Sequence, residues 1–289
     1  MHFLCTFIVF CVFHSSLHAQ PSGTNTIMDE ENRTYHLGVK EGEVASSCLL
    51  VGDHGRAQRL LHLMDDVRSV GKNHRHFYTY TGTFQGKKLT LMSIGMGIAM
   101  MDFAVREIAQ VTHGRLKFFR LGSAGTFRSD IFVGSIAVAH SSALIQTDYQ
   151  NFDDKECPYL VSKPFEGHQG LLQKFELSIK KKGLVAHEGL DVTCEEFYAT
   201  QGRRDANFID KNETLLDFLE QKHPETVSLQ METFKLYNLV QRAQKREIQA
   251  GAAAIIFAQR SSEVFLSDDE KKKIEVQVGQ AAMEALLSD

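Results

Sequence analysis

The sequence predicts a single-domain α/β protein, in which three α/β/α layers are built around a central mixed, mostly parallel sheet. Short apolar runs alternate with amphipathic segments from residue 48 to the C-terminus, and several of the runs end in glycine-rich turns. Strands covered on both faces read as continuous apolar runs joined by helices. The chain has four prolines and no low-complexity tract, so we expect no linker that divides it.

Each apolar run predicts a strand, and each amphipathic segment after it predicts a helix. In chain order we expect a strand at 48–52, a helix at 57–64, a strand at 89–93, a helix at 100–111, strands at 117–121 and 134–144, a helix at 167–182, an extended segment at 184–193, a strand at 227–231 that leads into a helix through 245, a strand at 252–258 and a helix at 268–287. No internal repeat is visible.

The composition is that of an ordinary globular protein and excludes one class of partner. Hydrophobic residues make up 43% of the chain and charged residues 24%. The formal net charge is −4 and the sequence pI is about 6.4, so the chain has no global basic surface. We therefore expect no nucleic-acid partner, and any anion site must be local.

The N-terminal segment is expected to be a signal peptide over residues 1–19, followed by an extension over 20–34 and the main domain over 35–289. Residues 3–13 are almost entirely apolar, and Ala19 offers a small residue before a cut ahead of Gln20. The run is too short to cross a bilayer, so we expect a secreted protein and no membrane partner. Because the leader begins without Lys or Arg, a cytoplasmic protein that starts at Met28 stays an alternative.

Three cysteines remain after this leader: Cys48, Cys157 and Cys194. An odd and widely spaced set is neither a disulfide framework nor a metal-ligand spacing. Cys48 opens an apolar strand, which favours a core residue over a reactive thiol.

Glycine-rich turns at the ends of successive strands predict an anion site. Such turns occur at 52–56, 95–97 and 120–126, and open α/β folds bind ligands beyond the carboxyl ends of their strands. Arg56 and Arg120 lie beside glycines, and Ser123 adds a hydroxyl donor, a combination suited to phosphate. The alternative is that the glycines only form turns and the arginines make surface ion pairs. No Walker or dinucleotide fingerprint is present, which argues against an NTPase or a dehydrogenase.

Two further groups have residue types that suit a nucleoside. Glu232 can accept hydrogen bonds from a vicinal diol such as ribose, with the Met231 thioether against the sugar. Gln201 and Arg203 offer an amide and a guanidinium that match the carbonyl and N–H edge of uracil. The alternatives are a helix N-terminal acid at Glu232, a core methionine at Met231, and a solvated turn at 197–205.

Taken together, these motifs resemble the uridine phosphorylases of the nucleoside phosphorylase superfamily, from about Tyr35 to the C-terminus. The matching motifs are Tyr35-His36-Leu37-Gly38, Gly52-Asp53-x-x-Arg56, His74-Arg75, Gly95-Met96-Gly97-Ile98, Arg120-Leu121-Gly122-Ser123-Ala124-Gly125, Phe197-Tyr198, Gln201-Gly202-Arg203-x-Asp205, Met231-Glu232 and Arg260. The Gln-Gly-Arg loop is the specific element, because it separates the uridine branch from relatives that act on purines.

The resemblance implies reversible phosphorolysis of uridine to uracil and ribose 1-phosphate, in pyrimidine nucleoside catabolism or salvage. It implies no metal or organic cofactor, since phosphate is a co-substrate, and a homodimer or larger homo-oligomer with shared active sites. The implied site has phosphate on Gly52, Arg56, Arg75, Arg120 and Ser123, ribose on His36, Met231 and Glu232, and uracil on Gln201 and Arg203. Arg260 would stabilise charge on the departing base, so the implied catalytic residues are Arg260, Arg120 and Glu232.

Two positions depart from the family pattern. His54 stands where the family often has proline, and Gln230 stands where it usually has an acid. Two alternatives therefore stay open beside uridine phosphorolysis. One is a purine nucleoside phosphorylase or a nucleosidase of the same superfamily, and the other is a secreted, non-catalytic storage or nucleoside-binding protein.

Overall fold

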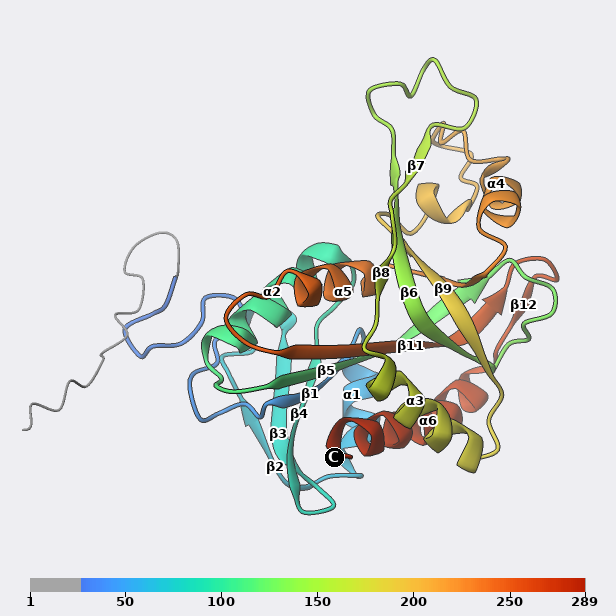
Figure 1. Cartoon of the computed structure of the whole chain (residues 1–289). Helices are drawn as coiled ribbons and strands as arrows, with labels where there is room; N and C mark the ends of the chain where they lie inside the picture. The colour runs from blue at the N-terminus through green and yellow to red at the C-terminus, as the bar shows by residue number, and fades with distance from the viewer. Residues whose placement is uncertain (1–26, 289) are drawn as a thin grey trace, which may run out of the picture.

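The protein is a three-layer α/β/α structure in which a twelve-stranded mixed sheet is covered by helices on both faces (Figure 1). The computed structural model describes residues 27–288, so the leader predicted at 1–19 and the first part of the extension, 20–26, lie outside the described residues. Within 27–288, no helix is long and apolar enough to cross a membrane. The predicted fold class is confirmed.

The elements follow one another in the predicted alternation. The helices are α1 (His54–Leu61), α2 (Ile98–Gln110), α3 (Gln169–Lys181), α4 (Leu215–Lys222), α5 (Thr233–Gln241) and α6 (Asp268–Leu287), with short 3₁₀ turns η1 (His74–His76) and η2 (Ala199–Gln201). The strands are β1 (Ser47–Val51), β2 (Asp65–Val70), β3 (Tyr78–Phe84), β4 (Lys87–Ser93), β5 (Leu116–Thr126), β6 (Ile136–Thr147), β7 (Tyr159–Val161), β8 (Phe165–Glu166), β9 (Ala186–Cys194), β10 (Thr226–Gln230), β11 (Ile248–Gln259) and β12 (Val264–Phe265).

The inner strand pairs of the sheet are mostly parallel, except that β5 pairs with β10 and β6 with β11 in antiparallel, and the margins are antiparallel. The strand order is β12-β11-β6-β9-β10-β5-β1-β4-β3-β2. β1 pairs in parallel with β4 and β5, β5 with β11, and β9 with both β6 and β10. Because β5 also contacts both β10 and β11, the strands β5, β11, β6, β9 and β10 close into a ring. The candidate site lies against this ring.

The two largest hydrophobic clusters among the described residues flank the sheet, as the alternation of side chains along a strand requires. In β1, Leu49 and Val51 pack with α1, α3 and α6, whereas Cys48 and Leu50 pack with α2 and α5. Figure 1 shows α2 and α5 on one side of the strands and α1, α3 and α6 on the other. Cys48 is fully buried, which confirms its expected place in the core.

Side-chain caps fix the first turns of three helices, with His168 as the cap of α3 and with the following caps for α1 and α6. Asp53 accepts the Arg56 backbone N–H at 2.7 Å and so begins α1 directly after β1. Ser267 and Glu270 form a capping box at the start of α6. Helices α1 and α6 therefore begin at defined residues beside the end of the sheet.

The structure differs from the expected elements in three ways. The segment 120–126, expected as a turn after a short strand, continues β5, and the register of its partner β11 shifts opposite Gly125. Glycines within this strand allow a bend and a close backbone approach, and the sequence pattern does not distinguish these from a turn. The helix expected through 245 ends at Gln241. The peripheral strands β2, β3, β7, β8 and β12 carry no long apolar run and the amphipathic segment of α4 follows none, so these elements are not among those expected.

Candidate active site

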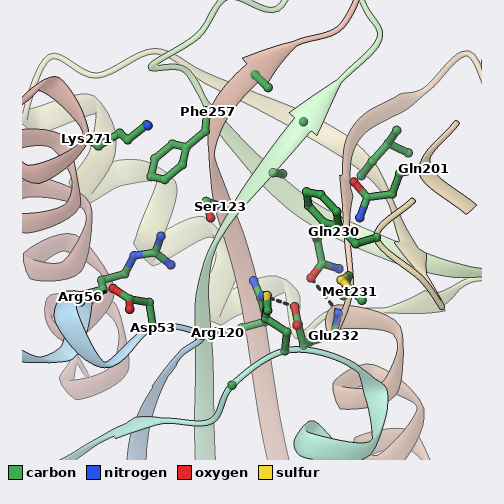
Figure 2. A pocket seen from close by; sticks show the side chains of 18 of the residues that line it. Asp53, Arg56, Arg120, Ser123, Gln201, Gln230, Met231, Glu232, Phe257 and Lys271 are labelled. Atoms are coloured by element: carbon green, nitrogen blue, oxygen red, sulfur yellow. Dashed lines mark hydrogen bonds and ion pairs between the residues drawn. The ribbon is translucent and has the colours of Figure 1, made fainter. Parts of the chain in front are cut away.

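One cavity of about 530 Å³ lies where β1, β4 and β10 end beside the second half of β5 (Figure 2). Its lining brings together eight of the residues selected from the sequence. They are Gly52, Arg56, Arg120, Ser123, Gln201, Arg203, Met231 and Glu232. His36, Arg75 and Arg260 do not line it.

One end of the cavity carries Arg56, whose guanidinium is held from behind. Arg56 Nε donates to Glu275 Oε1 at 2.9 Å, and Nη1 donates to the Leu121 carbonyl at 3.3 Å. Burial lowers the pKa of Arg56, while the charge of Glu275 opposes that shift. Glu275 also accepts from Arg59 Nε at 2.7 Å, so one buried carboxylate orients two guanidinium groups. A fixed guanidinium is suited to hold a tetrahedral anion.

Arg120 lies at the centre of the cavity and is almost fully buried. Its Nη2 donates to Glu232 Oε2, and its Nε and Nη1 are buried without a hydrogen-bond partner among residues 27–288. A side chain at position 122 would overlap the guanidinium, so Gly122 is what allows Arg120 to lie there. Arg120 can thus donate to a bound anion while it keeps its contact with Glu232.

Glu232 is fixed on both of its oxygens. Oε1 accepts the Gly97 N–H at 2.7 Å, and Oε2 accepts from Arg120. A carboxylate has about four acceptor positions, so two remain for donors such as the hydroxyls of a diol. Met231 lies beside Glu232 in Figure 2 and presents its thioether to the cavity. The pair fits the sugar role expected for it from the sequence.

The opposite end of the cavity is formed by the 197–203 loop. Gln201 is buried, and Arg203 is half-buried with its guanidinium 4.2 Å from the centre of the Phe197 ring. Burial and the nearby Arg260 lower the pKa of Arg203. Arg203 Nη2 lies 3.4 Å from Gln201 Oε1, so the amide and the guanidinium face the same space. Phe197 was missed as a separate site residue, although it belongs to the loop motif.

Arg260 lies behind this loop and holds it in place. Its Nη1 donates to the Gln201 carbonyl at 2.8 Å, and its Nη2 donates to the Gly202 carbonyl at 3.0 Å. The family resemblance implies that Arg260 faces the departing base. In the structure both Nη groups end on backbone carbonyls of the loop and Arg260 does not line the cavity, so its role at the base stays a prediction.

His36 and Arg75 lie together, away from the cavity. His36 Nδ1 is 2.5 Å from Glu107 Oε1, and its ring stacks on Phe103. Arg75 is exposed, and its guanidinium lies 5.2 Å from the centre of the Tyr35 ring. The resemblance implies that these two residues act at the site of a neighbouring copy of the chain. That they do not line the cavity of their own chain agrees with this expectation but does not test it.

Three further side chains line the cavity and were not predicted from the sequence: Phe257, Phe265 and Lys271. The Phe257 ring lies between two cations, with Arg56 at 5.7 Å and Lys271 Nζ at 5.4 Å from its centre. These residues come from β11, β12 and the start of α6. Their sequence neighbourhood is an ordinary strand and helix, so only the fold brings them to the site.

One group within 27–288 has metal-ligand spacing, and it lies outside the cavity. His140 Nε2 is 2.6 Å from Glu176 Oε1 and 3.3 Å from Glu188 Oε2. These side chains already pair with one another, so the group needs no ion. The expectation that no metal or cofactor takes part stays a prediction.

Comparison with known proteins places this site in a family. The profile described as "Phosphorylase superfamily" matches residues 47–288. A uridine phosphorylase of Thermococcus kodakarensis is 29% identical over 245 residues, which cover 84% of this chain and 83% of that protein. A DeoD-type purine nucleoside phosphorylase of Streptococcus pneumoniae is 28% identical over 181 residues, which cover 61% of this chain and 70% of that protein.

Solved structures agree with the sequence matches. A structure from a study of two uridine phosphorylases of the oomycete Phytophthora capsici superposes with a TM-score of 0.87 at 30% identity, covering 91% of this chain and 96% of that one. A Trypanosoma brucei nucleoside phosphorylase, at 20% identity and a TM-score of 0.76, covers 91% of this chain and all of its own length, and shares the fold. By its profile match, its fold and the residues of its cavity, the chain belongs to the phosphorylase superfamily.

Proposed function

We propose that this protein is a uridine phosphorylase, which converts uridine and phosphate to uracil and ribose 1-phosphate. The observation that carries the proposal is that one cavity holds three chemically distinct groups in sequence. Arg56, Arg120 and Ser123 suit a phosphate, Glu232 suits ribose hydroxyls, and Gln201 with Arg203 suits a pyrimidine edge. The uridine phosphorylases among the relatives support the same assignment.

The reaction needs no nucleophilic side chain. A phosphate oxygen attacks C1′ of the ribose, the C1′–N1 bond breaks, and its electron pair passes to the uracil ring. The proton of the attacking hydrogen phosphate leaves with the product uracil, so atoms and charges balance. Arg56 and Arg120 hold the phosphate beneath C1′, and this positioning supplies much of the rate enhancement.

Charge on the departing base is stabilised at the loop end. As the glycosidic bond breaks, negative charge grows on the uracil ring, and the cationic Arg203 interacts with it more strongly than with neutral uridine. Arg260 keeps the loop in place through the Gln201 and Gly202 carbonyls. The loop therefore both selects the base and lowers the barrier.

The same cavity argues against purine nucleosides as the main substrates. Protonation of a purine leaving group is a task for an acid near the base. The carboxylates that line this cavity are Asp53 and Glu232, and both lie at the phosphate and ribose side. Beside the loop the lining is Gln201, Arg203 and apolar residues. This composition favours a pyrimidine that leaves as an anion.

A shared active site in a homo-oligomer is part of the proposal. Tyr35, His36 and Arg75 form one surface group outside the cavity. Arg75 has φ of 68° and His76 has φ of 61°, values that residues other than glycine rarely adopt. Strained backbone of this kind is often found at functional sites. In the proposal this group completes the phosphate and ribose sites of a second copy of the chain.

A substrate panel tests the proposal. Purified protein is incubated with uridine or inosine, each with and without phosphate. We expect uracil release from uridine only when phosphate is present, and slower cleavage of inosine. Faster cleavage of inosine would assign a purine enzyme, release without phosphate would assign a nucleosidase, and binding without release would assign a non-catalytic protein.

We also propose secretion through the leader at 1–19, which N-terminal sequencing of the native protein tests.

A further inference from the structure

A buried carboxylate lies behind the ribose end of the cavity. Asp191 on β9 is 1% exposed and does not line the cavity. Its Oδ2 accepts from Gln230 Nε2 at 2.6 Å and from Ser142 Oγ at 2.8 Å, and its Oδ1 accepts from Ser228 Oγ at 2.7 Å. These donors come from β6 and β10, the two strands that flank β9 in the ring.

The donors of this hydrogen-bond network all point toward Asp191. Thr193 Oγ1 accepts from Gln230 Nε2 at 2.8 Å and from the Phe234 N–H at 2.9 Å. A hydroxyl has two lone pairs and one proton, so Thr193 must donate that proton to an acceptor. Two acceptors lie 3.1 Å from Thr193 Oγ1: Asp191 Oδ2, and Ser142 Oγ, which itself donates to Asp191. Gln230, Ser142 and Ser228 therefore all donate to Asp191, and Thr193 donates to it directly or through Ser142. Burial raises the pKa of Asp191, and the hydrogen bonds from Ser228, Ser142 and Gln230 oppose that rise.

This direction fixes the amide of Gln230. Because its nitrogen must face Asp191 and Thr193, its oxygen must face the other way, where Oε1 accepts the Glu232 N–H at 2.8 Å. Figure 2 shows Gln230 directly beside Met231 and Glu232. A reversed amide would bring its NH₂ group against the Glu232 N–H, leaving both without an acceptor.

The same network replaces the ordinary cap of α5. Glu232 is the N-cap residue of α5, yet its side chain makes no capping hydrogen bond. Thr193 Oγ1 accepts the Phe234 N–H in its place, which leaves the Glu232 carboxylate free to turn to Gly97 and the cavity. Two hydrogen bonds that depend on Asp191 thus determine where the backbone of Glu232 lies.

We propose that Asp191 is a positioning residue for the ribose site, acting through Gln230 and Thr193, and that position 230 holds an amide because position 191 holds the acid. The inference rests on the proposed function for its effect on turnover, and on the contacts alone for its effect on structure. It predicts that acid and amide can be exchanged between the two positions, provided that both are exchanged together.

Gln230→Glu is the first variant. It places a second carboxylate at hydrogen-bonding distance from Asp191, and repulsion between the two charges raises the pKa of one of them, so the pair shares a proton at low pH and loses it as the pH rises. We expect the uridine KM to rise by about tenfold near pH 8, because the hold on the Glu232 N–H is weakened, and to recover in part near pH 6. The charged or titratable groups around Asp191 are Arg120, Cys194, Glu232 and Tyr237, and they are unchanged in this variant.

The double variant Asp191→Asn with Gln230→Glu is the decisive one. The amide introduced at position 191 can donate to the carboxylate introduced at position 230, whose other oxygen accepts the Glu232 N–H, so the network is restored with its direction reversed. We expect the uridine KM to return to within about threefold of wild type across the pH range. Gln259→Glu is the matched control, because Gln259 is also buried but donates to the carbonyls of Arg128, Ser129 and Ile131. Adding Asp191→Asn to Gln259→Glu should not bring the uridine KM back toward wild type.

Amide hydrogen exchange at Glu232 and Phe234 separates this inference from the proposed function. Exchange at both amides should be slow in wild type and in the double variant, and at least about tenfold faster in Gln230→Glu, whether or not uridine is a substrate. A wild type without turnover would overturn the function alone. Gln230→Glu with wild-type exchange and KM, or a double variant no better than Gln230→Glu, would overturn the positioning role.

Discussion

Arg120 and Glu232 form a buried ion pair at the centre of the cavity, with Arg120 Nη2 donating to Glu232 Oε2. Both side chains are at most 5% exposed. In the proposed function Arg120 binds the phosphate and Glu232 binds the ribose, so the two halves of the site share a single contact. Removing one partner leaves the other as a buried charge without compensation.

Glu232→Gln tests this contact. The amide keeps the shape of the side chain but removes the charge that Arg120 and the ribose hydroxyls recognise. We expect kcat/KM for uridine to fall by about a hundredfold, since hydrogen bonds to charged groups contribute about 1.5–3 kcal/mol each. Steady-state kinetics measure this change in kcat/KM, and Glu176→Gln serves as a control outside the cavity. A loss of less than about threefold would contradict the assigned role.

Glu275 determines the position of Arg56, and Glu275→Gln should show this in the phosphate kinetics. Loss of the Glu275 carboxylate loosens the Arg56 guanidinium, whose Nε lies 2.9 Å from Glu275 Oε1. We expect the phosphate KM to rise by about tenfold, with a smaller change in the uridine KM and a lower melting temperature. Arg59→Met, which removes only the outer partner of Glu275, should affect the phosphate KM less. Equal effects from the two variants would argue against the orienting role.

Arg203 and Arg204 provide a paired test of base recognition. Arg203 lines the cavity and packs on Phe197, whereas its neighbour Arg204 is exposed. Arg203→Ala should lower kcat/KM for uridine by about a hundredfold and leave the phosphate KM within about threefold. Arg204→Ala should leave both kcat/KM for uridine and the phosphate KM within about threefold of wild type. If Arg203→Ala weakened phosphate and uridine equally, the loop would not be the base-reading element.

Arg260→Ala should act through the loop. Loss of the two hydrogen bonds to the Gln201 and Gly202 carbonyls frees residues 199–203. We expect faster amide exchange across this segment together with a rise of about tenfold in the uridine KM. Reduced turnover with unchanged loop exchange would instead support direct contact of Arg260 with the base.

The cysteines give a pH-dependent prediction that is independent of turnover. Burial raises the pKa of Cys48 to about 12 and raises the pKa of Cys194 well above its usual value. Only thiolates react readily with alkylating agents, so both should stay unmodified near pH 8 in the folded protein. Cys157 is partly exposed and should react first. Mass spectrometry after iodoacetamide treatment, native and unfolded, measures the difference. Early labelling of Cys48 would contradict its burial.

The parts of the fold that the sequence predicted are those with strong local patterns. Continuous apolar runs such as Leu49 to Val51 identify the central strands, because burial on both faces leaves no polar alternation. The marginal strand β2, with the sequence DDVRSV, is largely exposed and carries no such pattern. Its pairing with β3 depends on tertiary contacts that no local window contains.

The site residues likewise divide into those with a local sequence motif, which were predicted, and those that only the fold brings to the cavity. Arg56, Arg120 and the 197–205 loop stand beside glycines or in a compact motif, so they were found from the sequence. Lys271 and Phe257 were missed, because they reach the cavity only through the packing of α6 and β11. Arg260 was found as a residue, but its contacts with the loop were not predicted, because the direction of its guanidinium is set by carbonyls 58 and 59 residues away.

In the proposed reaction, one cavity binds phosphate, ribose and uracil together and exchanges the base for phosphate. The most direct measurement is the stoichiometry of uridine cleavage, with uracil, ribose 1-phosphate and remaining phosphate quantified in the same reaction. Phosphorolysis predicts one uracil and one ribose 1-phosphate for each phosphate consumed, and re-formation of uridine when the two products are mixed. Uracil that appears together with free ribose, without loss of phosphate, would contradict it.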